Sequence, residues 1–187
     1  MRFTWFALLL MVFLGTRAWG QAQPRSESTL RRYEIYGGSA FSGGNPSGDS
    51  FGGGFGFSGN FTRWAGALGE FTILQHNCCV VNSITLTDYL LGPRIAKRLS
   101  ASSRVTPFAD VLFGGQTLHN SSNHHSWEFN NGSGPAIAGD GGADISVTSR
   151  LALRGEFGFI HSRFSRLGAS AVSNDRWRAG TYIVYRF

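Results

Sequence analysis

Apolar and polar residues alternate along much of this chain, in segments separated by stretches rich in Gly, Ser and Asn. The clearest segment runs from Phe51 to Trp64, where Phe51, Phe55, Phe57 and Phe61 share one parity and small or polar residues take the other. Because successive side chains of a strand point to opposite faces, this segment predicts a strand with one aromatic face and one small, polar face.

Eight segments of this kind predict eight strands, at 31–41, 51–64, 65–74, 83–98, 104–116, 136–148, 151–162 and 174–187. The connections alternate between short ones, at 63–65, 99–103 and 148–150, and long ones, at 42–50, 75–82, 117–135 and 163–173. Tight turns at one end and longer loops at the other are typical of an outer-membrane barrel. No helical segment is evident that could cover the aromatic face as a second layer, so the pattern favours one sheet closed on itself.

The charged residues of these segments decide which face meets lipid. In segment 151–162, Leu153 and Phe157 alternate with Arg154 and Glu156. A basic side chain facing lipid at the bilayer midplane costs about 2–4 kcal/mol, so the charged face must be the interior of the barrel. The acids of that parity are Glu34, Glu70, Asp88, Asp110, Asp140, Asp144 and Glu156, and the bases are Arg94, Arg98, Arg154, Arg176, Arg178 and Arg186.

Acids and bases are therefore nearly balanced inside the expected barrel. An eight-stranded barrel has an interior just wide enough for side chains to fill, and buried charges persist only when they are paired and hydrogen-bonded. We predict a lumen closed by ion pairs. The structural charge network that closes it comprises Glu34, Glu70, Asp88, Arg94, Asp110, Asp140, Asp144, Arg154, Glu156 and Arg178.

The start of the chain predicts export. Arg2 is followed by an apolar stretch over 3–14, and Ala18-Trp19-Gly20 offers a small-x-small cleavage site before Gln21. We therefore expect a signal peptide at 1–20, a polar lead-in at 21–30 and a barrel domain at 31–187. The remaining basic excess is scattered along the chain, which argues against nucleic acid as a partner.

The chain resembles the bacterial outer-membrane β-barrel family related to the OmpA transmembrane domain. The resemblance rests on the order and spacing of segments 90–95 (LLGPRI), 105–115 (VTPFADVLFGG), 139–144 (GDGGAD), 151–154 (LALR) and 184–187 (VYRF). It implies an all-β fold, an eight-stranded antiparallel up-and-down transmembrane β-barrel, which is integral to the bacterial outer membrane and has no enzymatic activity in most members.

The resemblance also implies partners: outer-membrane lipid, and the assembly machinery that recognises the last strand during biogenesis. The assembly signal would comprise Gly180, Ile183, Tyr185 and Phe187 in a monomeric protein. The family usually has a glycine five residues before the terminal aromatic residue. Here Tyr182 stands in that place, and Gly180 lies two residues earlier.

Candidate chemical groups are few. His119, His124 and His125 fall in the longest expected loop, and imidazole suits zinc, copper or nickel. A short His-rich tract is only compositional evidence, so we predict no metal site and no cofactor. The adjacent Cys78 and Cys79 cannot form an ordinary unstrained disulfide, which leaves reduced thiols, a strained ring or pairing between molecules. No nucleophile and base stand out in catalytic spacing, so we predict no enzyme.

Three functions fit these observations. The first is a structural, surface-exposed barrel with a charge-plugged lumen, whose outer loops are available for adhesion or envelope integrity. The second is a passive, porin-like channel or carrier for small solutes across the outer membrane, similar to OmpW. The third is a soluble barrel that binds an apolar ligand, in which Phe55, Phe57 and Phe61 would face inward.

Overall fold

The computed structural model describes residues 33–45, 48–62, 64–78, 82–97, 104–122, 132–166 and 169–187. The expected signal peptide (1–20) and lead-in (21–30) lie outside these residues, as does Arg98. Within the described ranges, no helix is long and apolar enough to cross a membrane.

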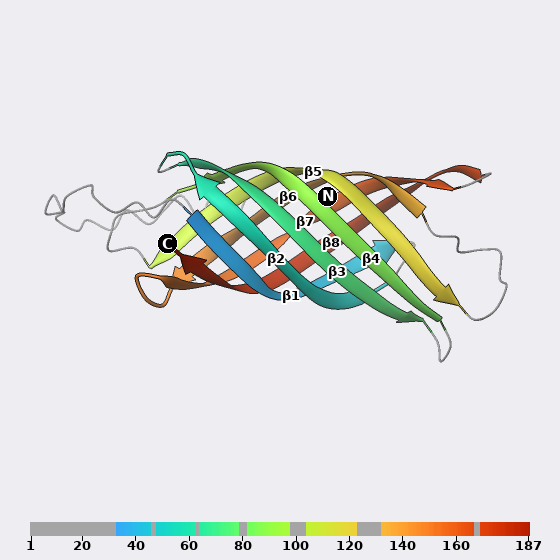
Figure 1. Ribbon diagram of the computed structural model, residues 1–187, viewed down its shortest axis with the longest axis horizontal. Helices are drawn as coiled ribbons and strands as arrows, with labels where there is room; N and C mark the ends of the chain where they lie inside the picture. Colours follow the sequence, from blue (N-terminus) through green and yellow to red (C-terminus); the bar gives the residue numbers. More distant parts are fainter. Residues whose placement is uncertain are drawn as a thin grey trace, which may run out of the picture.

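The described residues form eight strands. In chain order they are β1 (Tyr33–Asn45), β2 (Ser50–Asn60), β3 (Ala65–Cys78), β4 (Asn82–Ala96), β5 (Val105–Ser122), β6 (Gly132–Ser146), β7 (Leu151–Arg166) and β8 (Ala169–Arg186). Each strand pairs antiparallel with the next, and β1 pairs with β8, which closes the sheet into a tilted barrel (Figure 1). The predicted eight-stranded up-and-down barrel is confirmed.

The short connections have a local cause in the sequence. In the β2–β3 turn, the Thr62 hydroxyl oxygen accepts hydrogen bonds from the backbone N–H groups of Trp64 (3.1 Å) and Ala65 (2.9 Å). The Thr148 hydroxyl does the same in the β6–β7 turn, for Arg150 (3.1 Å) and Leu151 (2.9 Å). A hydroxyl that satisfies the backbone two and three residues on stabilises a tight turn. We call this end of the barrel the turn end.

Most strands run further at the opposite end, the loop end, than the sequence pattern predicted. The expected loop 117–135 begins inside β5 and ends inside β6, because β5 extends to Ser122 and β6 starts at Gly132. The expected loops 42–50, 75–82 and 163–173 are shortened in the same way. Residues 117–122 are largely polar, so they lack the apolar alternation that marks a strand facing lipid, yet they continue the backbone ladder with β4.

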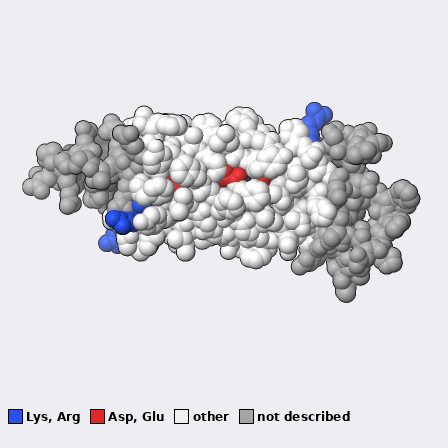
Figure 2. Space-filling view, viewed as in Figure 1, with Lys and Arg blue, Asp and Glu red and all other residues white. Residues whose placement is uncertain are grey.

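One set of large apolar side chains lies on the outside of the barrel, while another, which includes Leu68, Leu86 and Leu112, is buried inside it. Phe55, Phe57 and Phe61 are 62%, 48% and 79% exposed, so they point away from the lumen. Figure 2 shows a side wall almost free of charge, with Lys and Arg at its two ends and only a small acidic area at mid-height. The soluble barrel with inward phenylalanines is therefore wrong, because the lumen is lined by the opposite parity.

Aromatic rings gather at the turn end. Tyr33 stacks on Phe57 at 5.8 Å between ring centroids, and it lies 6.1 Å from Phe187, which is 6.2 Å from Tyr185. The first and last strands close here, since the Phe187 N–H donates to the Tyr33 carbonyl (3.0 Å). Trp64 also lies at this end, half-exposed in the β2–β3 turn. Such a cluster is typical of the interfacial aromatic girdle of a membrane barrel.

Candidate functional site

The lumen contains three layers of charged side chains, and the layer nearest the turn end is centred on Arg154. Its guanidinium donates to both carboxylate oxygens of Asp144 (2.7 and 3.0 Å) and to Glu34 (3.1 Å). Arg186 donates to the same two acids, at 2.8 Å to Asp144 and 3.2 Å to Glu34. Ser58 adds a hydroxyl donor to Glu34 at 3.1 Å.

Arg94 and Asp110 complete this turn-end layer. Two parallel hydrogen bonds of 2.8 and 2.7 Å join them, the bidentate geometry that gives a guanidinium and a carboxylate their strongest pairing. The layer then has three carboxylates (Glu34, Asp110, Asp144) and three guanidinium groups (Arg94, Arg154, Arg186), so its formal charge is balanced. All except Arg186 are buried, and Arg186 is nearly so.

Aromatic rings pack against this layer from inside the lumen. Phe108 lies under the guanidinium groups of Arg94 (4.3 Å to the ring centroid) and Arg154 (5.0 Å), and the Tyr36 ring lies 4.6 Å from Arg154. These cation–π contacts stabilise the buried arginines on the side that no carboxylate reaches. Tyr36 and Tyr182 meet edge to face at 5.3 Å and fill the space above the layer.

Glycine makes room for these rings. A Cβ at Gly56 would lie 2.3 Å from the Tyr36 ring, and one at Gly180 would lie 2.2 Å from the Tyr182 ring. Each tyrosine therefore lies flat along the inner wall above a glycine. Gly180 thus leaves room for the ring of Tyr182, the residue that stands five places before the terminal aromatic residue.

The middle layer is centred on Arg178. Its guanidinium donates to both oxygens of Asp140 (2.7 and 2.6 Å) and to Glu70 (2.6 Å). Glu70 also accepts hydrogen bonds from the Tyr36 hydroxyl (3.2 Å) and the Thr72 hydroxyl (3.1 Å). Every oxygen of these two carboxylates is thus held by a donor.

Glu156 belongs to the same layer but is held differently. It is buried, and it accepts no hydrogen bond from a guanidinium group among the described residues. The middle layer therefore has three carboxylates (Glu70, Asp140 and Glu156) around the single guanidinium of Arg178. The balance predicted for the lumen as a whole does not hold within this layer.

The loop-end layer is built around Asp88. Arg176 and the Gln116 amide both donate to its carboxylate. Arg176 also donates to the Ser42 hydroxyl at 3.1 Å, and Ser162 donates to the Gln116 carbonyl oxygen at 2.7 Å. A small cavity lined by Asp88 of this layer and by Glu156 and Arg178 of the middle layer has a volume of about 10 Å3, close to the least that holds one water molecule.

The ten residues named from the sequence as the charge network are all buried in the lumen, at 8% exposure or less. The sequence pattern did not identify four uncharged residues that contact these charged side chains directly or, for Ser162, through Gln116: Tyr36, Phe108, Gln116 and Ser162. They share the inward parity, which is the signal that could have identified them, but nothing in the pattern shows that an uncharged inward residue bonds to a charge. Of the proposed assembly signal, Ile183, Tyr185 and Phe187 face outward, whereas Gly180 is buried inside.

The possible metal ligands remain apart or outside the described residues. His119 lies exposed near the end of β5, while His124, His125 and Cys79 are not among the described residues. In the part of the chain that the structure describes, no group of three or more His, Cys, Asp or Glu side chains could hold a metal ion.

Comparisons with known proteins agree on the fold. No protein-family model matches the sequence, and no curated protein matches it. Among solved structures, Neisserial surface protein A is similar with a TM-score of 0.62, 10% identity and coverage of 83% of this chain and 97% of that one. The outer membrane protein OprG of Pseudomonas aeruginosa has a TM-score of 0.58, 14% identity and coverage of 83% and 95%. The attachment invasion locus protein Ail of Yersinia pestis has a TM-score of 0.54 and 14% identity, with coverage of 83% of this chain and 100% of that one. The chain therefore has the fold of the small eight-stranded barrels that span bacterial outer membranes.

Proposed function

We propose that this protein is an integral outer-membrane barrel with a structural, surface-exposed role and a lumen that conducts no solute. The observation that carries this proposal is the set of three hydrogen-bonded layers across the lumen, centred on Arg154, Arg178 and Asp88. A passing solute would have to break buried ion pairs in each layer, and breaking one such pair costs about 3–5 kcal/mol.

The orientation of the barrel follows from its two ends. The turn end, with its tight turns and its ring of Tyr33, Tyr185 and Phe187, faces the periplasm, and the loop end faces the exterior. Ile183, Tyr185 and Phe187 present outward side chains at the closing strand, where the assembly machinery would meet them during insertion. The loops at the other end are then available for adhesion or for contacts that maintain the envelope.

Two similar structures support the surface role. One is called a surface protein and another an attachment invasion protein. A passive channel needs a continuous path, and the hydrogen-bonded side chains of Arg178 and Arg176 stand across the lumen in the middle and loop-end layers. We therefore favour the structural role over the channel, and we include no catalytic activity in it.

Conductance tests this proposal directly. The refolded protein is inserted into planar bilayers, and we expect no reproducible conductance steps. The matched variant carries Tyr36→Ala and Tyr182→Ala, which removes the two rings that meet inside the lumen. We expect this variant to show small, frequent steps.

Tyr33→Ala is the control, because Tyr33 is exposed on the outer face and its removal leaves the lumen closed. Steady conductance steps from the unmodified protein would contradict the proposal, since the layers would then open at rest. Silence from the Tyr36/Tyr182 double variant would show only that the charged layers close the lumen unaided.

A further inference from the structure

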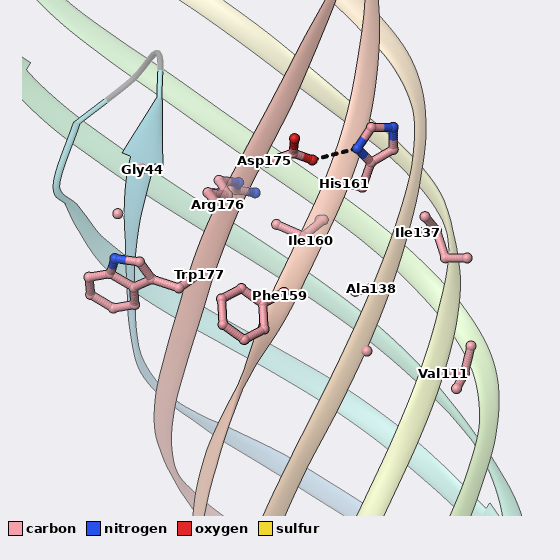
Figure 3. A pocket seen from close by; sticks show the side chains of 12 residues that line it. Gly44, Val111, Ile137, Ala138, Phe159, Ile160, His161, Asp175, Arg176 and Trp177 are labelled. Carbon is pink, nitrogen blue, oxygen red and sulfur yellow. Dashed lines mark hydrogen bonds and ion pairs between the residues drawn. The ribbon is translucent and has the colours of Figure 1, made fainter. Parts of the chain in front are cut away.

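The outer wall of the barrel has a groove of about 640 Å3 towards the loop end (Figure 3). Gly139 on β6 forms its floor. Val111 on β5, Phe159 on β7 and Trp177 on β8 lie in the same row of cross-strand partners and form its sides. A Cβ at Gly139 would meet no atom within 4 Å, so the groove is open down to the backbone.

Polar side chains stand at the loop-end side of this groove. His161 and Asp175, which are cross-strand partners, lie one row further along, with His161 Nδ1 2.5 Å from Asp175 Oδ1. Their side chains are 50% and 76% exposed. Arg163 follows two residues after His161 on β7 and is exposed. Alternate residues of a strand share a face, so Arg163 points outward beside His161.

The pairing sets the direction of the histidine ring. Nδ1–H donates to the Asp175 carboxylate, so Nε2 points away from Asp175 (Figure 3). Nε2 is therefore the ring nitrogen that is free to meet a ligand, beside the exposed Asp175 carboxylate, which also lines the groove. Arg163 lies one outward position further along β7, beyond the residues that line the groove.

A second groove, of about 600 Å3, has no such polar end. It lies over β1, β2, β3 and β8, with Gly37 and Gly69 at its floor. Its other outward-facing residues are Ile35, Phe55, Phe57, Phe71, Ile183 and Tyr185, none of which is charged. The buried Glu70 also lines this groove, so the two grooves differ in their exposed polar side chains rather than in size.

We propose that the groove over Gly139 binds a phosphorylated membrane lipid, with one acyl chain along the apolar floor and its phosphate at Arg163 and His161. A guanidinium binds phosphate oxygens through two parallel hydrogen bonds. The apolar part of the groove ends at polar side chains. In a lipid, the apolar acyl chain likewise ends at a polar headgroup, so the two match in order. The inference rests on the proposed location in a membrane.

Trp177 provides the readout, because its indole forms one side of the groove. Of the five tryptophans, Trp5, Trp19, Trp64 and Trp127 are replaced by Phe, so that only Trp177 fluoresces. The refolded chain is placed in maltoside micelles, which contain no phosphate. Dibrominated phosphatidylglycerol or dibrominated diacylglycerol is then added at equal mole fraction, since bromine quenches a tryptophan that it touches.

We expect phosphatidylglycerol to quench Trp177 at a several-fold lower mole fraction than diacylglycerol. Arg163→Gln should remove that difference, and Gly139→Ile should weaken quenching by both lipids because it fills the floor. Gly69→Ile is the matched control: its Cβ would lie an ordinary 3.6 Å from Leu91, and it fills the groove without a polar end. We expect it to leave Trp177 quenching unchanged.

Equal quenching by the two lipids, unaffected by Arg163→Gln, would overturn the lipid site while leaving the membrane barrel intact. Absence of quenching by either lipid would overturn both, since Trp177 would then have no access to acyl chains. An equal loss of quenching in the Gly139 and Gly69 variants would also overturn it, because the effect would not depend on this groove.

Discussion

Two carboxylates of the middle layer, Glu156 and Asp140, should respond in opposite ways to the same change of charge. The layer has three carboxylates around Arg178, and Arg178 donates to Asp140 and Glu70 but not to Glu156. Glu156→Gln and Asp140→Asn each replace a buried carboxylate by its amide isostere. Each therefore keeps the side-chain volume and removes one acidic group.

The magnitudes follow from the contacts. Asp140→Asn replaces an acceptor oxygen of a bidentate pair by an NH₂ group that faces the guanidinium. Breaking a buried ion pair costs about 3–5 kcal/mol, and we take the lower end, about 3 kcal/mol, because Arg178 keeps Glu70. Glu156→Gln removes a surplus acid and leaves no guanidinium unpaired. We expect it to be neutral or to raise the free energy of unfolding.

The assay is equilibrium unfolding in urea of the two variants and the parent, refolded in the same detergent. Free energies come from linear extrapolation, and an unchanged slope shows that the folded barrel is equally compact. A loss in Glu156→Gln as large as that in Asp140→Asn would refute the reasoning, because the surplus acid would then be as important to the layer as the paired one.

Three further outcomes test the wall and the last strand. Phe55→Arg should impair insertion by about 2–4 kcal/mol, whereas Phe61→Arg, in the exposed turn, should cost about 0–1 kcal/mol, measured as the folded fraction by heat-modifiable gel mobility. Gly158→Ala should prevent folding, because its Cβ would lie 2.3 Å from the Gly139 backbone carbonyl oxygen and 2.1 Å from Asp140 Oδ1, while Gly139→Ala should fold normally in the same gel assay. Phe187→Ala should lower the amount of folded barrel in cells but not its yield on refolding into lipid in vitro; an equal fall in both would place the role of Phe187 in the fold rather than in assembly.

The sequence predicted the strand count and the inward face of the barrel, because lipid outside and charge inside impose a period of two. It predicted the loop-end limits of the strands poorly. His119, for example, is a polar residue on the outward face. Apolar and polar residues therefore no longer alternate there, although the backbone pairing with Thr85 continues. The alternation of apolar and polar residues therefore indicates how far the lipid-facing part of a strand extends, and not where the strand ends.

The identity of the inward charges also came from the sequence, but their partners did not. Arg154 and Glu34 are 120 residues apart in the chain and meet because β1, β7 and β8 close the barrel. The surplus acid at Glu156 could not be foreseen, since a count of charges is balanced over the lumen and not within a layer.

The groove over Gly139 could not be predicted from the sequence either, because it depends on how the strands are aligned. Its residues come from neighbouring strands that the register aligns in one row, and no segment of the chain shows the row by itself. The sequence by itself determined which face of each strand meets lipid, because that choice depends on alternate residues of one segment. Only the tertiary structure decided which side chains share a height in the barrel, because height depends on the stagger between strands.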